Sequence, residues 1–447
     1  MLRSPRRRID SDFVHFSIRI ENFAHVRRAY GEEGARAAVA GICRLLTDLL
    51  RADGIAVPEA DGSIDVLVWN LDALRGGTLA DACRTWLAEF CWLVPLCGFD
   101  TPLGPVHLRI SGRWDIPDTL PSAPDTLPRA PDTLPRAGVS ETGRSGICDL
   151  GFGGALPDDR GDWSDRYRRD MSLVTGLLSG IMAGACDEPG CRELALAWQP
   201  VCDPSCPDTM LYHEALVRLL DRDGKVHAPD EVFQALERLG FVRVVDHYVV
   251  SRVIDELEEA PDVILGANIS ARSVCEDIWW DQIRTRLRTM PDVARRLVLE
   301  ITETADLPEM SGAVRFVAGM RRLGCRIALD DFGTGHASIR YLLALSPDLV
   351  KIDRFFVRRT ATGEAGRDLL AHMIGVGRSL GAEVIVEGVE TAEQADIVLS
   401  AGGRWQQGYH WGRPALCRTW RKAPGEPEAA GSGLTGSVVS RSVAHGR

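Results

Sequence analysis

Carboxylate, amide and amine side chains stand at the ends of apolar segments throughout the second half of this chain. They are Glu214 in YHEAL, Asn268 in VILGANIS, Glu300 in RLVLEITE, Asp330 and Asp331 in CRIALDD, Lys351 in LVKID and Glu387 in AEVIVEGVE. Several carboxylates in one place would repel one another unless cations compensated them. Neither His nor Cys occurs at these segment ends, so the oxygen ligands predict Mg²⁺ or Mn²⁺ rather than zinc.

The adjacent pair Asp330 and Asp331 indicates two metal ions, with one carboxylate bridging them. Two such ions suit in-line attack on a phosphodiester, because they generate hydroxide, align it and neutralise charge on the phosphate oxygens. Lys351 would hold or polarise the attacking water. The alternative is that acidic residues at strand ends cap the helices that follow. Capping, however, favours Ser, Thr and Asp over repeated Glu with Lys.

These residues need a scaffold that brings them together although they are far apart in the sequence. From Leu194 to about Lys422, short apolar runs alternate with helical stretches, which is typical of repeated β/α units. Eight such units form a barrel of about 250 residues, and the carboxyl ends of its parallel strands share one face. The second half is therefore predicted to be an α/β domain with a TIM-like (β/α)8 barrel.

An ordered series of motifs over about the last 230 residues resembles the signature of EAL-domain phosphodiesterases. The motifs are QPV at Gln199, EALVR at Glu214–Arg218, NIS at Asn268, EITE at Glu300, DDFGTG at Asp330–Gly335, KID at Lys351, VEGVE at Glu387 and QGYHWGRP at Gln407. The resemblance implies metal-dependent hydrolysis of cyclic di-GMP to linear 5'-pGpG. The alternative is a receptor that binds cyclic di-GMP without cleaving it. Such receptors usually lack a metal ligand, and every matched position is present here.

The resemblance also implies a role for each matched residue. Glu214, Asn268, Glu300 and Asp330 would bind one ion, and Asp330, Asp331 and Glu387 would surround the second. Lys351 would contact the nucleophilic water, which makes Lys351, Glu214, Glu387 and Asp331 the expected catalytic set. Arg218 would bind a substrate phosphate, and Gln199 and Gln407 would bind the nucleotide. Glu303 would hold down the loop after DDFG.

The first half shows a weaker resemblance to GGDEF cyclase domains. IRIENF and the helical pattern that follows it, within Phe16–Leu46, read as the strand, turn and helix that open such a domain. Arg19 stands where the family has its first metal-binding Asp, Glu21 replaces the second, and the hairpin at Asp61–Trp69 lacks the acidic pair. Because arginine cannot coordinate a cation, we expect no diguanylate cyclase activity. We expect instead a degenerate, smaller α+β domain with a regulatory or dimerisation role.

Composition divides the chain into four segments. Residues 12–164 are the expected GGDEF-like domain, interrupted at 117–137 by a proline-rich heptad repeat that cannot be a helix or a central strand. A helical linker is predicted at 165–190, with apolar positions Met171, Val174, Leu177 and Leu178 at helical spacing. The phosphodiesterase domain follows at 191–423, and the Gly- and Ser-rich tail at 424–447 is predicted to be disordered.

Charge and composition limit the partners. A net charge of -11 argues against DNA or RNA, which are bound through clustered Lys and Arg. No apolar run is long enough to span a membrane and no signal peptide is evident, so a cytoplasmic protein without membrane insertion is expected. Cys186, Cys191, Cys202 and Cys206 lack the usual C-x2-C metal spacing, which favours ordinary thiols over a structural metal. A homodimer is expected from the resemblance, and no protein partner can be named.

Overall fold

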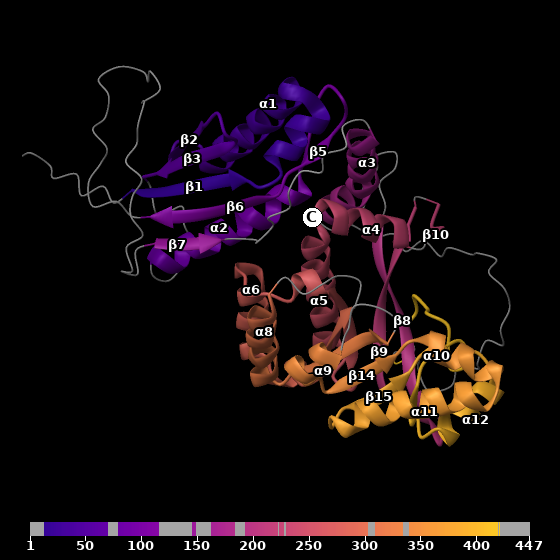
Figure 1. Cartoon of the computed structure of the whole chain (residues 1–447). Helices are drawn as coiled ribbons and strands as arrows, with labels where there is room; N and C mark the ends of the chain where they lie inside the picture. The colour runs from indigo at the N-terminus through magenta and orange to yellow at the C-terminus, as the bar shows by residue number, and fades with distance from the viewer. Residues whose placement is uncertain are drawn as a thin grey trace, which may run out of the picture.

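A computed structural model of the chain describes residues 13–69, 79–115, 145–148, 162–183, 193–221, 223–227, 229–302, 309–333, 339–418 and 420. The heptad repeat at 117–137, Glu303, Cys186, Cys191 and the tail at 424–447 lie outside these residues. Figure 1 shows a front domain in indigo and purple beside a barrel in orange and yellow, with α3 and α4 at their junction. The described residues thus form a front domain and a barrel.

The front domain is an antiparallel sheet with two long helices. The sheet has the order β2-β3-β1-β6-β7. Its strands are β1 (Val14–Ile20), β2 (Gly54–Pro58), β3 (Ser63–Val68), β6 (Ile110–Asp115) and β7 (Ser145–Cys148), and β4 (Gly98–Phe99) pairs separately with β5 (Val106–His107). The helices are α1 (Phe23–Leu50) and α2 (Leu79–Leu96). Strands β6 and β7 are paired neighbours, although residues 116–144 separate them in the sequence.

The sequence pattern of the front domain accounts for its sheet and its hairpin. Strand β1 buries Val14, Phe16, Ile18 and Ile20 on one face, as the period of two along a strand requires. Gly62, the glycine of the DGSIDV segment, lies in the turn between β2 and β3 with a φ of 87°. A Cβ there would lie 2.4 Å from the Phe23 ring, so the turn requires glycine.

Helix α3 (Asp162–Ala183) connects the two domains. Met171, Val174, Leu177 and Leu178 are buried, as their helical spacing indicates. The helix packs against α1 of the front domain and against α4 (Asp230–Leu239) of the second domain. Arg238 on α4 binds Asp170 through two hydrogen bonds of 2.8 and 2.7 Å, a paired geometry that also fixes orientation. Helix α3 thus packs against both domains.

The second domain is a closed barrel, as predicted. Its strands are β8 (Glu193–Asp203), β9 (Cys206–Leu220), β11 (Leu265–Ser270), β12 (Leu297–Thr302), β13 (Arg326–Phe332), β14 (Leu349–Ile352), β15 (Glu383–Val386) and β16 (Trp405–Gln406). Successive strands from β9 through β11 to β16 pair in parallel. Strand β8 closes the barrel by antiparallel pairing with both β9 and β16, and β10 (Val226–His227) extends β9 as a short hairpin.

The reversed direction of β8 differs from the parallel barrel of eight repeated β/α units that the sequence predicted. Only Pro204 and Ser205 separate β8 from β9. A parallel pair needs a crossover of about a dozen residues or more, so this short connection can only form a hairpin. The pattern of apolar residues is the same for a strand in either direction. The predicted barrel fold is confirmed, and one of its eight strands, β8, is antiparallel to its neighbours.

Helices cover the outside of the barrel between its strands. They are α4, α5 (Val242–Glu259), η2 (Ala271–Ser273), α6 (Ile278–Thr289), α7 (Pro291–Ala294), α8 (Met310–Leu323), α9 (Ile339–Leu345), α10 (Arg354–Arg359), η3 (Thr360–Thr362), α11 (Glu364–Ser379) and α12 (Ala392–Ser400). Within the described ranges, no helix combines the length and the apolar character needed to cross a membrane. Cys202 and Cys206 are free thiols at the β8–β9 hairpin.

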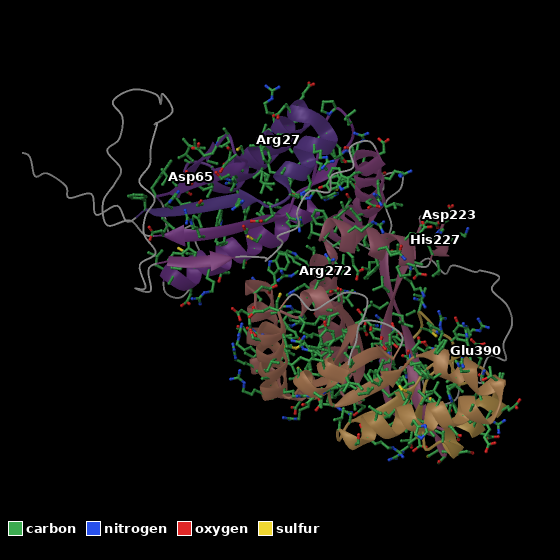
Figure 2. All side chains as sticks on the ribbon, viewed as in Figure 1. Arg27, Asp65, Asp223, His227, Arg272 and Glu390 are labelled. Carbon is green, nitrogen blue, oxygen red and sulfur yellow. The ribbon has the colours of Figure 1, made fainter. Side chains whose placement is uncertain are left out.

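The front domain packs on one side of the barrel through aromatic side chains. Trp279 on α6 donates a hydrogen bond to the carbonyl of Ala88 on α2, at 3.3 Å, and its ring meets that of Trp92 edge-on with centroids 5.7 Å apart. His107 on β5 makes a similar edge contact with Phe241, which precedes α5. Figure 2 places Arg272 on the same side of the barrel. The domain contact is therefore a packed one.

His107 makes this domain contact sensitive to acid. The ring is fully buried, and Nδ1 lies 2.9 Å from the carbonyl oxygen of Pro95. Burial lowers the pKa of His107 to about 4, although the hydrogen bond to Pro95 opposes the shift. An unfolded histidine titrates near pH 6.5. Between those values the unfolded chain binds one more proton at this position, so stability is complete above pH 6.5 and falls as the pH drops towards 4.

Replacing this histidine should flatten the acid dependence of stability. His107→Gln retains an amide donor for Pro95 but cannot be protonated. We expect its free energy of unfolding to fall less steeply on acidification, by up to about 1.4 kcal/mol per pH unit. Urea denaturation from pH 7.5 to pH 5 measures this slope, with the exposed His372→Gln as the control. Parallel slopes for His107→Gln and the wild type would contradict the assignment.

Candidate active site

The residues at the predicted segment ends meet inside the barrel. Asn268 lies in β11, Glu300 in β12, Asp330 in β13 and Lys351 in β14, and Glu387 comes directly after β15. Parallel strands bring these side chains to one end of the barrel.

Glu214 reaches the same place by a different route. The sequence indicated a position at or just beyond the end of a strand. In the structure, Glu214 lies in the middle of β9. The reason is that β8 and β9 form a hairpin longer than the other strands of the barrel. Glu214 is paired with Gln199 on one side and with Gly266 on the other. Its position is therefore set by strand register.

Lys351 lies at the centre of the carboxylates. Its side chain is 0% exposed, so water cannot solvate the ammonium charge. Its Nζ lies 2.7 Å from Glu300 Oε2, 2.7 Å from Glu387 Oε1, 3.0 Å from Glu214 Oε2 and 3.1 Å from Asp330 Oδ1. A single buried ammonium thus faces four acidic groups, and the carboxylates exceed the positive charge available to them.

The pKa shifts in the cluster follow from burial and from this excess. Burial raises the pKa of Glu300 to about 8, and the charges of Glu214 and Asp330 add to the effect while Lys351 opposes it. Burial alone would lower the pKa of Lys351, yet the surrounding carboxylates hold it well above its ordinary value. Burial would also raise the pKa of Glu214, but Lys351 and two amide donors lower it. The cluster is chemically suited to additional cations.

The acidic side chains form two groups that share one member. In each group, one carboxylate oxygen per residue lies within 4.8 Å of the others. The groups are Glu214, Glu300 and Asp330, and Asp330, Asp331 and Glu387. Asp330 is the member common to both groups. The resemblance assigns the same carboxylates to two ions and adds Asn268 to the first, and this assignment remains a prediction.

Unpartnered buried oxygens show that the residues fit a metal ion. Asn268 donates to Glu214 Oε1 at 2.6 Å. Asn268 Oδ1 and Glu300 Oε1 are buried acceptors without a hydrogen-bond partner among the described residues. A buried polar group left unpaired costs about 1–3 kcal/mol. Mg²⁺ and Mn²⁺ bind oxygen ligands, so coordination to either ion would give both atoms a partner. The acidic cluster can therefore hold a metal ion.

The backbone at Asp331 lets two consecutive carboxylates serve the same site. Successive residues of a regular strand point to opposite faces. Here the pairing of β13 with β14 changes register between Leu329 and Phe332, and Asp331 has a φ of 54°, which is rare for a residue with a side chain. Burial raises the pKa of Asp331 to about 7, helped by the charges of Asp330 and Asp353. Irregular backbone of this kind is often retained at functional sites.

The predicted substrate-binding residues do not all lie at the cluster. Gln407 Nε2 donates to Glu214 Oε2 at 2.5 Å and to Gln199 Oε1 at 3.3 Å, so both amides adjoin the carboxylates. Arg218 lies four residues beyond Glu214 on β9, about 13 Å further along the strand, and donates to the carbonyl of Val217. Glu303 is outside the described residues.

Two residues that the sequence did not single out contact the site or its supports. Tyr212 is buried and donates its hydroxyl to Glu300 Oε2 at 3.1 Å. Burial, with a further contribution from Glu300, raises the pKa of Tyr212 well above its ordinary value, so the hydroxyl remains a donor. Asp246 on α5 accepts the backbone N–H of Ser270, two residues after Asn268. The available signal for Tyr212 was its spacing of two from Glu214, which puts both on one strand face.

Comparison with known proteins identifies a family for the second domain. The family model described as EAL domain matches residues 189–414. Cyclic di-GMP phosphodiesterase PdeF of Escherichia coli (strain K12) is 30% identical over 208 residues, which cover 46% of this chain and 28% of that protein. Cyclic di-GMP phosphodiesterase PdeL of the same organism is 28% identical over 206 residues, covering 45% and 57%.

A solved structure, an EAL domain protein from Listeria monocytogenes EGD-e, is 25% identical with a TM-score of 0.46, covering 50% of this chain and 89% of the other. The chain thus spans between about a quarter and somewhat over half of the length of these two curated relatives. The family match itself extends over half of this chain and includes every strand of the barrel. The chain therefore belongs to the EAL domain family.

Proposed function

We propose that this protein hydrolyses cyclic di-GMP to linear 5'-pGpG with Mg²⁺ or Mn²⁺ as cofactor. The observation that carries the proposal is the arrangement of the acidic residues around the buried Lys351. They form two clusters of three carboxylates, and Asp330 belongs to both. Two relatives that match 46% and 45% of this chain are named cyclic di-GMP phosphodiesterases. Membership of the EAL family supports the substrate, and the oxygen ligands support the choice of metal.

The side chains of the cluster have distinct parts in this reaction. Glu214, Asn268, Glu300 and Asp330 would hold one ion, and Asp330, Asp331 and Glu387 the other. When bound, two such ions supply a hydroxide nucleophile near neutral pH and neutralise charge on the phosphate oxygens. Lys351 Nζ holds the carboxylates in place and can donate a proton in a hydrogen bond to the attacking water. Gln199, Gln407 and Arg218 would contact the nucleotide or its phosphate.

A direct assay tests the proposal. Purified protein is incubated with cyclic di-GMP and Mg²⁺ or Mn²⁺, with EDTA in a parallel sample, and the nucleotides are separated by chromatography. Appearance of pGpG only in the presence of metal is the expected result. Unchanged substrate, together with binding still measurable by calorimetry, would replace the enzyme with a cyclic di-GMP receptor.

We propose further that the front domain regulates the barrel and is not a cyclase. Arg19 lies on β1 with an exposed side chain, and Glu21 accepts a hydrogen bond from Ser111. These are the positions where the GGDEF resemblance expects metal-binding carboxylates. Incubation with GTP and Mg²⁺ should therefore yield no cyclic di-GMP.

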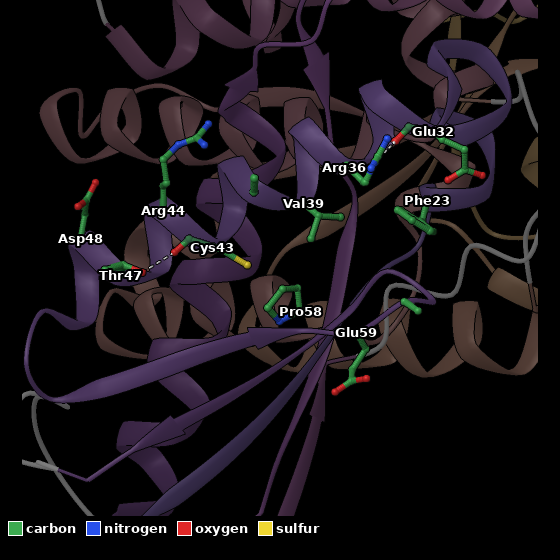
Figure 3. A pocket seen from close by; sticks show the side chains of 12 residues that line it. Phe23, Glu32, Arg36, Val39, Cys43, Arg44, Thr47, Asp48, Pro58 and Glu59 are labelled. Atoms are coloured by element: carbon green, nitrogen blue, oxygen red, sulfur yellow. Dashed lines mark hydrogen bonds between the residues drawn. The ribbon is translucent and has the colours of Figure 1, made fainter. Parts of the chain in front are cut away.

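The cavity beside the β2–β3 hairpin supports the same expectation. It has a volume of about 770 Å³ and lies between α1 and the hairpin, in the front domain and away from the carboxylate cluster (Figure 3). Its charged lining residues are Glu32, Asp48 and Glu59 against Arg36 and Arg44. A triphosphate requires an excess of positive charge or a metal site. This lining has no such excess.

A series of contacts leads from the front domain towards the metal site. Trp92 and Ala88 of α2 contact Trp279, and the ring of Trp279 lies 5.3 Å from that of His247 on α5. Burial lowers the pKa of His247 to about 4, so this aromatic contact is an uncharged one at neutral pH. Helix α5 is therefore part of the barrel surface on which the front domain packs.

Helix α5 in turn supports the strand that bears Asn268. Asp246, the neighbour of His247, accepts hydrogen bonds from the backbone of Ser270 and from the hydroxyl of Ser273. Ser270 is the last residue of β11, two positions after Asn268, and Ser273 ends the short helix η2 that follows. A change in how α2 sits on α6 and α5 can thus alter the position of an expected metal ligand. This physical connection supports a regulatory role for the front domain.

Removing the aromatic contact should lower hydrolysis without touching the site. For Trp92→Ala we expect kcat to fall by about 2- to 30-fold, the range of typical coupling energies between sites. The matched control is Trp86→Ala on the same helix, whose ring stacks on Phe90 and packs against Phe16 inside the front domain. Wild-type activity in Trp92→Ala, or an equal loss in both variants, would contradict the coupling.

The homodimer and the cytoplasmic location remain predictions. Ile339 and Leu343 lie one turn apart on the same face of α9 and expose 57% and 61% of their surfaces, although both are large and apolar. Exposed apolar side chains of this kind are typical of self-association surfaces. Light scattering of the wild type and of Leu343→Glu tests the dimer: equal masses for the two would exclude this surface.

A further inference from the structure

Tyr212 places a hydroxyl against a single carboxylate of the site. The residue is 1% exposed and lies in β9, two positions before Glu214. Its hydroxyl is 3.1 Å from Glu300 Oε2, the same oxygen that lies 2.7 Å from Lys351 Nζ. Lys351 is shared among four carboxylates, whereas Tyr212 donates to Glu300 alone among its described partners. The phenol is therefore the donor dedicated to this ligand.

Gly266 provides the space that this arrangement needs. It lies in β11, where it is paired with Glu214 of β9 and with Val298 of β12. A Cβ on Gly266 would lie 2.1 Å from Glu300 Oε1 and 2.6 Å from the Tyr212 ring. Both distances are far shorter than any real contact of a methyl group. The missing side chain in β11 is what allows the ring and the carboxylate to occupy their positions.

We propose that Tyr212 and Gly266 position Glu300 for metal binding. Tyr212 holds Oε2 through its hydroxyl, and Gly266 leaves the notch into which the carboxylate fits. Neither residue touches the metal or the substrate, so both are positioning residues. A donor that orients a metal-ligating carboxylate acts on metal affinity through ligand geometry. The inference rests on the proposed function, because it takes Glu300 as a ligand of the first ion.

Removal of the hydroxyl alone tests Tyr212. Tyr212→Phe retains the ring that fills the barrel, so the core stays packed. We expect calorimetry on the full chain to show Mn²⁺ binding weakened by about 10- to 100-fold. The Mn²⁺ concentration for half-maximal hydrolysis should rise by the same factor, while saturating Mn²⁺ restores kcat. Tyr30→Phe, which removes another largely buried tyrosine hydroxyl in the front domain, is the control.

Filling the notch tests Gly266 independently. Gly266→Ala should weaken Mn²⁺ binding in the same direction, because the added methyl group displaces Glu300. The matched control is Gly375→Ala on α11, where a Cβ would meet no atom within 4 Å. A purely structural role for Tyr212 and Gly266 would instead lower the melting temperature and leave the Mn²⁺ dissociation constant unchanged.

The outcomes separate this inference from the proposed function. If the wild type hydrolyses cyclic di-GMP and Tyr212→Phe binds Mn²⁺ equally well, the positioning role is wrong and the function stands. If the wild type neither binds Mn²⁺ nor hydrolyses, the function is wrong. The positioning role is then wrong as well, because a chain that binds no Mn²⁺ has no ion for Glu300 to hold.

Discussion

Replacing Lys351 with methionine is expected to destabilise the metal-free protein by about 3–5 kcal/mol and to make its stability depend on divalent ions. The fully buried ammonium contacts four carboxylates. Methionine fills much of the same volume without charge, so the acidic groups lose their compensating cation. Protonation relieves some of this repulsion, as the raised pKa of Glu300, about 8, already indicates. Mn²⁺ would relieve the rest.

Urea denaturation in EDTA and in excess Mn²⁺ measures this effect. We expect the variant to gain far more free energy of unfolding from Mn²⁺ than the wild type gains, and to hydrolyse no cyclic di-GMP. Lys225→Met is the matched control, because Lys225 is an exposed lysine outside the barrel core. Equal stability of Lys351→Met in EDTA and in Mn²⁺ would show that the lysine does not balance the carboxylates.

The second large effect is expected at Glu214. Glu214→Gln preserves the shape of the side chain but removes the charge that faces Lys351 and the expected ion. Metal-ion catalysis contributes several kcal/mol to phosphodiester hydrolysis, and each 1.4 kcal/mol is a factor of ten in rate. We therefore expect kcat to fall by about 1,000-fold or more, together with weaker Mn²⁺ binding.

Release of pGpG, followed by chromatography, measures the loss. Glu390→Gln is the control: this glutamate belongs to the same VEGVE segment as Glu387, but its side chain is exposed on the barrel (Figure 2). The control should retain wild-type activity. Metal-dependent turnover in Glu214→Gln at the wild-type rate would mean that the ion binds elsewhere.

Much of the barrel was predictable because its signals are local. Each parallel strand is a short apolar run, and the helical stretches between the runs require crossovers, so the alternation alone indicates a β/α barrel. The direction of β8 was missed because apolar residues alternate identically in both directions. The two-residue connection at Pro204 and Ser205 was the signal that reveals the hairpin.

The convergence of the acidic residues was also predictable, but their contacts with one another were not. Oxygen side chains at strand ends indicated which residues meet, and the two acidic groups correspond to that expectation. The central place of Lys351, the notch at Gly266 and the hydroxyl of Tyr212 all depend on how neighbouring strands are aligned. Alignment is a property of pairs of distant segments, such as Gly266 with Glu214, and a single sequence carries little information about it.

The closure of the barrel has a consequence for the synthesis of the chain on the ribosome. Strand β8 pairs with β9 on one edge and with β16 on the other. Cys202 on β8 therefore cannot pair with Gln406 until β16 has been synthesised. Roughly 200 residues separate the two, which at 5–20 residues per second is about 10 to 40 s of translation. During that time the edge of β8 is an unpaired template for other strands. The emerging chain therefore depends on protection of that edge until its last strand has been made.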